Sequence, residues 1–302
     1  MRPAAALTVV SCLLLAGCGG SGGDTTTDAT PGGGKTLEEL WRAPGDDVTV
    51  IAGTASHEPG TVRLSFLVVD AEGQVVTLPT ARVFVARDLE SEPFLESSAK
   101  LERIGVPGGM EADATHIYVA HVRLPGPGKY WLLAEPEGGR DVQALGNVVV
   151  VEQDSALDVG EPAVASETPT LASTKDISEL TTRVPPDESL LRYSIAESLR
   201  ANAPFVVTFS TPKFCSSRTC GPVVDVVEEV ARRFEGTDVR FIHAEVYEDN
   251  DPAKPFNRWM REWGLETEPW TYLIDKRGTI VERYEGVVSV NELEDAVREK
   301  LT

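Results

Sequence analysis

The stretch that decides the fold is residues 204–223, which read Pro-Phe-Val-Val-Thr-Phe-Ser-Thr-Pro-Lys-Phe-Cys-Ser-Ser-Arg-Thr-Cys-Gly-Pro-Val. Its first part, Phe205–Phe209, is nearly all apolar, which is typical of a strand buried on both faces. From residue 223 to 234 apolar side chains recur on one helical face, and Pro222 suits the first turn of a helix. The stretch therefore predicts a buried strand, a loop with two cysteines, and a helix.

The loop cysteines, Cys215 and Cys220, stand just before the predicted helix. Unpaired N–H groups and the positive end of the helix dipole stabilise a thiolate at such a place, so we expect a lowered thiol pKa. Lys213 and Arg218 add positive charge nearby. These residues indicate a reactive pair.

Together with a second segment, these residues resemble the thioredoxin superfamily. That segment runs from Trp263 through Pro269 to Gly286 and is similar to the second half of the family fold, where a cis-proline precedes two strands. The resemblance covers about the last third of the chain and implies a thioredoxin-like α/β domain. It also implies that Pro269, with Glu268 and Trp270 beside it, shapes the groove that receives the client's backbone.

The sequence departs from the family pattern in two respects. Four residues separate Cys215 from Cys220, whereas the family has two, and either cysteine can be aligned with the first of the family's pair. Which cysteine attacks therefore stays open. Thr208 stands where the family has a buried acid on the strand before the cysteines, so a proton-accepting carboxylate is missing there.

The resemblance implies thiol-disulfide exchange on exported thiol or disulfide proteins, with Cys215 and Cys220 as the redox pair and no cofactor or metal. One alternative is a non-enzymatic binding module in which the same two cysteines form a structural disulfide. A less favoured alternative is a copper metallochaperone, because thiolates with an imidazole such as His243 bind copper. Neither the client nor the direction of electron flow follows from the sequence.

The N-terminus has the features of a secretory signal. Arg2 is followed by an apolar run that is too short to span a bilayer, and then by small residues. The four residues that end at Cys18, Leu-Ala-Gly-Cys, resemble the lipoprotein box, in which the cysteine carries lipid. We therefore expect a cell-membrane protein, lipid-anchored through Cys18 and facing outside the cytoplasm.

Composition limits the partners. The chain has 302 residues and a formal charge of −20, which argues against nucleic acid because phosphate binding needs a basic patch. Of its four cysteines, Cys12 leaves with the signal and Cys18 carries lipid, so Cys215 and Cys220 remain. In an oxidising compartment such a pair is expected to form a disulfide.

Short apolar runs separated by turn residues fill the region from residue 48 to 152. This spacing predicts an all-β sandwich, and residues 124–134 resemble the tyrosine-bearing strand of immunoglobulin-like domains. The expected organisation is a signal peptide at 1–17, a flexible tether at 18–40, an immunoglobulin-like sandwich at 45–153, a linker at 154–187 and a thioredoxin-like domain at 188–302.

Overall fold

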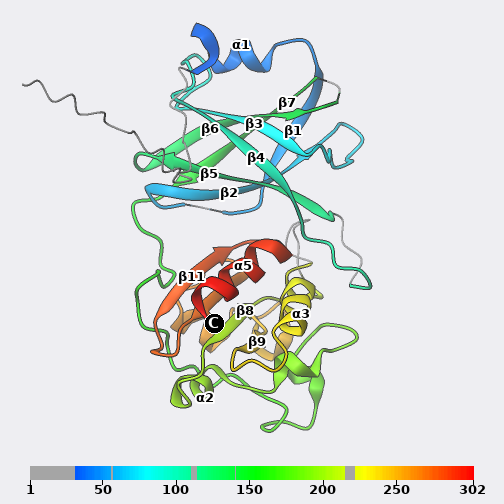
Figure 1. The fold of residues 1–302 in the computed structure, drawn as a ribbon, viewed down its shortest axis with the longest axis vertical. Coiled ribbons are helices and arrows are strands. Elements are labelled where there is room, and N and C mark those ends of the chain that lie inside the picture. The colour runs from blue at the N-terminus through cyan, green and yellow to red at the C-terminus, as the bar shows by residue number, and fades with distance from the viewer. Residues whose placement is uncertain (1–30, 56, 110–113, 140, 215–221) are drawn as a thin grey trace, which may run out of the picture.

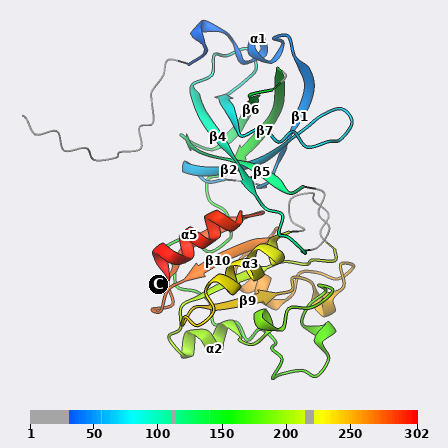
Figure 2. The same cartoon turned by 45° about the vertical axis from the view of Figure 1, so that its right-hand side comes forward.

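The computed structural model describes residues 31–55, 57–109, 114–139, 141–214 and 222–302. Its N-terminal part is a closed barrel and its C-terminal part is a four-stranded sheet with helices packed on it (Figure 1). Turning the molecule by 45° shows α3 and α5 side by side on the same face of that sheet (Figure 2).

Seven strands form the barrel. In sequence order they are β1 (Asp46–Ala52), β2 (Gly60–Val69), β3 (Thr80–Ala86), β4 (Leu95–Arg103), β5 (His116–Leu124), β6 (Gly128–Glu137) and β7 (Val142–Val150). Around the barrel the order is β1-β2-β5-β4-β3-β6-β7, and a parallel pairing of β1 with β7 closes it. Closure leaves no open sheet edge, and alternate side chains fill the interior.

The expected all-β region is present, but its expected arrangement as an immunoglobulin-like sandwich of two stacked sheets is corrected, because the seven strands form one closed barrel. Alternating apolar residues predict that strands exist and which face of each is buried. They do not determine whether the first and last strands pair, and here Asp46 to Thr49 pair with Val142 to Leu145.

A short helix, α1 (Leu37–Trp41), precedes the barrel. Thr36 and Glu39 form a capping box at its start, and Leu37 is completely buried against β3 and β6. Residues 37–40, expected to belong to a flexible tether, are thus part of this helix.

The C-terminal sheet has the strand order β11-β10-β8-β9. Its strands are β8 (Phe205–Phe209), β9 (Arg240–Ala244), β10 (Trp270–Ile274) and β11 (Ile280–Glu285). β9 runs parallel to β8, whereas β10 is antiparallel to both of its neighbours, β8 and β11.

The two faces of this sheet are covered differently. The helices α3 (Val223–Arg233) and α5 (Val290–Lys300) pack together on one face. The other face is covered by the short helices α2 (Ile195–Arg200) and α4 (Arg258–Glu262) and by irregular chain from residues 156–164.

The expected thioredoxin-like α/β fold is contradicted. The chain is mostly β, with a closed barrel, a four-stranded sheet, and helices that make up about 20% of it. Layered α/β domains have helices on both faces of the sheet. Here the two longest described helices share one face, and the opposite face carries only the short helices α2 and α4 together with irregular chain. The local sequence patterns that predict single strands and helices do not show which face of the sheet each helix covers.

The segment expected as a linker at 154–187 lies against the sheet. The Ser166 hydroxyl donates to the Glu262 carboxylate at 2.5 Å and accepts from the Trp263 indole N–H at 3.2 Å. Ser166 is completely buried. After this segment, Ser194 and Glu197 form a capping box at the start of α2.

The two domains contact each other through apolar and charged groups. Leu67 and Ile117 of the barrel belong to the same buried cluster as Val223 and Val287 of the C-terminal domain. None of the helices in the described ranges combines the length and the apolar character that a membrane span requires.

Candidate functional site

The structure places both flanks of the cysteine loop but not the cysteines. Cys215 and Cys220 lie outside the described residues, as does Cys18. The chain leaves β8 at Phe209 and is described to Phe214, and it resumes at Pro222, the N-cap of α3. The roles predicted for these three cysteines therefore stay predictions.

Pro269 lies next to the first of these flanks. In the register of β8 and β10, Trp270 is paired with Phe209, so the residues before Trp270 come alongside those after Phe209. The Thr211 backbone N–H accordingly donates to the Glu268 carboxylate. The Glu268–Pro269 peptide bond is cis, the isomer expected from the sequence.

Trp270 is part of the core. It is 5% exposed and stacks on Tyr272 with ring centroids 5.7 Å apart. Its indole N–H donates to the Thr267 hydroxyl at 3.0 Å. Trp270 is therefore packed in the core and does not line the groove, whereas Glu268 and Pro269 do.

Glu268 is the most strongly perturbed carboxyl of the described chain. Burial raises its pKa to about 7, the hydrogen bond from Thr211 opposes the rise, and the negative charge of Glu245 adds to it. Its Oε2 atom is buried and has no hydrogen-bond partner among the described residues. Near neutral pH, this group can therefore accept or release a proton.

A second buried carboxylate, Glu245, follows β9 and is 3% exposed. Its Oε1 accepts from the Thr182 backbone N–H at 2.6 Å and from the Thr182 hydroxyl at 2.8 Å. Its Oε2 is buried without a partner within the described ranges. The two carboxyls thus come from the ends of two different strands of one sheet.

His243 is held neutral in the same region. Burial lowers its pKa, although Glu245, 4.0 Å away, opposes this. Because the Ser210 carbonyl can only accept, Nε2 carries the proton and donates to it at 3.0 Å, and Nδ1 accepts from the Thr181 hydroxyl. Within the described ranges no three potential metal-ligating side chains lie together.

A groove of about 400 Å³ lies at Pro269, and both domains line it. The barrel contributes Ala52–Ala55 and the residues Asn147 to Val149, and the sheet contributes Thr267 to Pro269 with Glu285 and Gly286. Val149 is 41% exposed. The domains meet closely here, since a Cβ on Gly286 would lie 1.9 Å from the Gly53 carbonyl oxygen.

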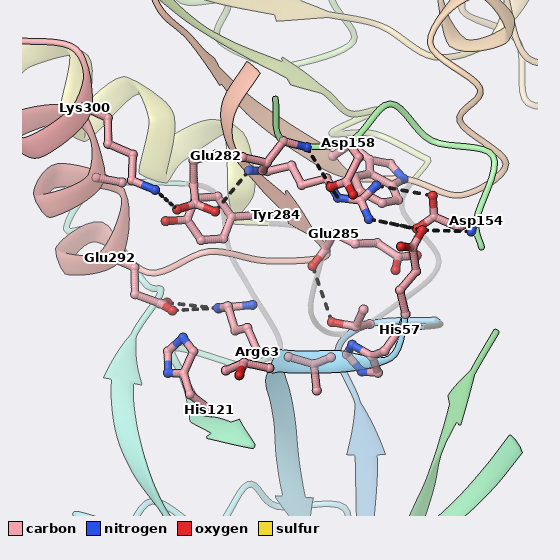
Figure 3. A pocket seen from close by; sticks show the side chains of 18 of the residues that line it. His57, Arg63, His121, Asp154, Asp158, Glu282, Tyr284, Glu285, Glu292 and Lys300 are labelled. Atoms are coloured by element: carbon pink, nitrogen blue, oxygen red, sulfur yellow. Dashed lines mark hydrogen bonds and ion pairs between the residues drawn. The ribbon is translucent and has the colours of Figure 1, made fainter. Parts of the chain in front are cut away.

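A larger cleft of about 640 Å³ continues between the domains (Figure 3). On one side Arg63 of β2 reaches to Glu292 of α5, with Nε to Oε1 at 2.6 Å, and it donates to the Val287 carbonyl oxygen at 3.0 Å. Burial opposes ionisation of Glu292, but Arg63 and its hydrogen bonds hold the pKa of that carboxyl below its usual value. This ion pair joins the two domains.

The other side of the cleft contains a second clamped arginine. Arg283 of β11 pairs with Asp154 at 3.2 Å and with Asp158 at 3.2 Å. Its guanidinium lies over the Trp270 ring, 5.5 Å from the ring centroid. The charges of both arginines in the cleft are therefore already neutralised by carboxylates.

Comparison with protein-family models gave no match, and a search of curated proteins found no similar sequence. The site is therefore interpreted from its own chemistry.

Sequence reasoning identified Glu268 as a groove residue but not as an acid with a shifted pKa, and it missed Glu245. The pattern His243-Ala-Glu245 at the end of an apolar strand could have indicated Glu245 as a site residue, because charged residues are rarely buried unless they are paired or functional.

Proposed function

We propose that this protein carries out thiol-disulfide exchange on exported proteins through Cys215 and Cys220. The observation that supports this most directly is the Glu268 carboxyl. It is partly buried, its pKa is raised to about 7, and it accepts a hydrogen bond from the backbone N–H of Thr211, four residues before Cys215. Exchange needs thiolates, and a carboxyl with a pKa near ambient pH can take up the proton that a thiol must lose. Glu268 thus supplies a proton-accepting carboxyl, the group that is missing at Thr208 on the strand before the cysteines.

In the reductive direction the steps are as follows. The thiolate of one cysteine attacks a client disulfide, forms a mixed disulfide, and releases one client thiolate. The second cysteine, after giving its proton to Glu268, attacks the mixed disulfide and releases the second client thiolate. The pair is then oxidised, the client is reduced, and the released thiolates take up protons. Oxidation of a client is the same sequence reversed.

The test compares three variants of the full chain: Cys215→Ser, Cys220→Ser and Glu268→Gln. Turnover of a disulfide-bonded model protein should be lost in both serine variants. In Glu268→Gln the rise of the rate near pH 7 should move to higher pH, because the proton acceptor is gone. Turnover that survives in both serine variants would overturn the proposal.

We also propose that Cys18 anchors the protein to the membrane, with the folded part outside the cytoplasm. The support is the order of charged residue, apolar run and small residues before Cys18. Cys18→Ala should move the protein from the membrane fraction to the soluble fraction. Unchanged membrane attachment would refute the anchor.

A further inference from the structure

We propose that the cleft between the two domains binds a positively charged segment of another protein and so guides that protein to Pro269. That the bound protein is an exchange client rests on the proposed function, whereas the binding itself does not. The barrel then has a defined role, because it forms one wall of the binding site.

The groove at Pro269 and the larger cleft adjoin each other where the Thr54 hydroxyl donates to the Glu285 carbonyl oxygen at 3.5 Å. Thr54 of the barrel and Glu285 of β11 line both of them. We call the two adjoining hollows the trough; together they extend from Glu268 and Pro269, past the two arginine clamps, to the C-terminal part of α5 at Lys300. A segment bound in this trough would have one end beside the flank of the cysteine loop.

The charge of the trough favours a cationic occupant. Eight carboxylates and three Arg or Lys side chains line the larger cleft, so its formal net charge is −5, with histidines neutral. That is a quarter of the −20 of the whole chain. All three cations are already paired, Arg63 with Glu292, Arg283 with Asp154, and Lys300 with a carboxylate of β11.

Acidic groups without an ion-pair partner among the described residues are present in both parts of the trough. Asp295 and Glu299 of α5 line the larger cleft, are exposed, and have no ion-pair partner within the described ranges. Independently, the Glu268 carboxyl lines the groove at Pro269 with an Oε2 atom that is buried and has no described partner. A lysine or arginine side chain would satisfy both the free charges and the buried oxygen.

Other occupants fit less well. Residues 3–30 of this chain contain no Lys or Arg, so its own N-terminal segment is not the cation. A second copy carries the same charge of −20 and is repelled, as are nucleic acid and anionic lipid. A basic segment of a different protein remains as the occupant that the charges favour.

The experiment measures binding of short fluorescent peptides to the full chain in non-ionic detergent, by fluorescence anisotropy. One peptide alternates lysine with serine, and its matched partners alternate glutamate or glutamine with serine; none has a cysteine. The test variant is Asp295→Lys with Glu299→Lys. The control variant, Glu72→Lys with Glu90→Lys, changes the net charge equally at exposed positions of the barrel that do not line the cleft.

We expect the lysine peptide to bind most tightly, with roughly tenfold weaker binding to the test variant, little change in the control variant, and loss of the preference at high salt. Equal binding of the three peptides, or equal weakening in both variants, would overturn the proposal.

The same peptides separate this inference from the proposed function. Binding that persists in a Cys215→Ser, Cys220→Ser double variant shows that the cleft acts without the thiols. If lysine-peptide binding is absent while turnover of a small-molecule disulfide persists, the cleft proposal fails and the exchange proposal stands.

Discussion

Replacing Glu268 with glutamine should make the stability of the protein less dependent on pH. The pKa of this carboxyl is raised by burial from the ordinary 4.5 to about 7 in the folded chain. Below pH 4.5 the group is protonated in both the folded and the unfolded chain, so its burial costs little. Between pH 4.5 and 7 the unfolded chain loses the proton and the folded chain keeps it, so the free energy of unfolding falls as the pH rises.

The expected change in the free energy of unfolding follows from the size of the pKa shift of Glu268. A displacement of about 2.5 pKa units corresponds to roughly 3 kcal/mol, of which about 2.5 kcal/mol is lost between about pH 5 and about pH 8. Glutamine keeps the shape of the side chain and cannot ionise. The free energy of unfolding of Glu268→Gln, taken relative to that of the wild type, should therefore rise by about 2 kcal/mol or more between about pH 5 and about pH 8.

The assay is urea unfolding at about pH 5 and about pH 8, with both proteins compared at each pH. Glu266→Gln, an exposed carboxyl two residues earlier, is the matched control and should show no such change. If the difference between Glu268→Gln and wild type is the same at both pH values within about 0.5 kcal/mol, Glu268 does not have the raised pKa on which the proposed proton transfer depends.

The remaining predictions concern the domain interface. Arg63→Met should lower the free energy of unfolding by about 3 kcal/mol, because it leaves the carboxylate of Glu292 largely buried and unpaired; a loss under about 1 kcal/mol in urea unfolding would contradict this. Gly286→Ala should lower the melting temperature more than Gly160→Ala. Both glycines have a positive φ, but only the first would bring a methyl group to 1.9 Å from the Gly53 carbonyl, whereas the second has open space. Equal losses in the two alanine variants would show that the domains are not in close contact there.

Local features of the fold were predictable from the sequence where a strong signal acts within a few residues. The strand Phe205–Phe209 and the capping box at Ser194 are of this kind, because an apolar run and a Ser–Glu pair at the right spacing are visible within a few residues. The cis bond before Pro269 was expected from the resemblance to a family pattern.

Long-range arrangement was not predictable in the same way. The strand Leu95–Arg103 is mostly polar, and its pairing with β3 and β5 comes from the closed barrel and not from alternation. Closure through β1 and β7 replaced the expected sandwich. In the C-terminal part, irregular chain on the second face of the sheet replaced the expected α/β layering, because no local pattern shows what covers a distant face.

The candidate site was predictable in part. Glu268 and Pro269 were identified from a motif, but the raised pKa of Glu268 comes mainly from burial and secondarily from Glu245. Both depend on how the strands β8, β9 and β10 pair in the sheet. The contribution of the barrel to the groove could not be inferred, since Val149 and Thr54 are far from Pro269 in sequence.

The central claim is that Cys215 and Cys220 form an exchanging pair. The most direct test is the reduction potential of this pair in the full chain, measured by equilibration against thiol buffers with trapping of free cysteines. We predict a potential within the range of exchange proteins, between about −270 and −120 mV. A potential below about −300 mV, where structural disulfides lie, would contradict the claim and leave a binding module whose cysteines only form a structural disulfide.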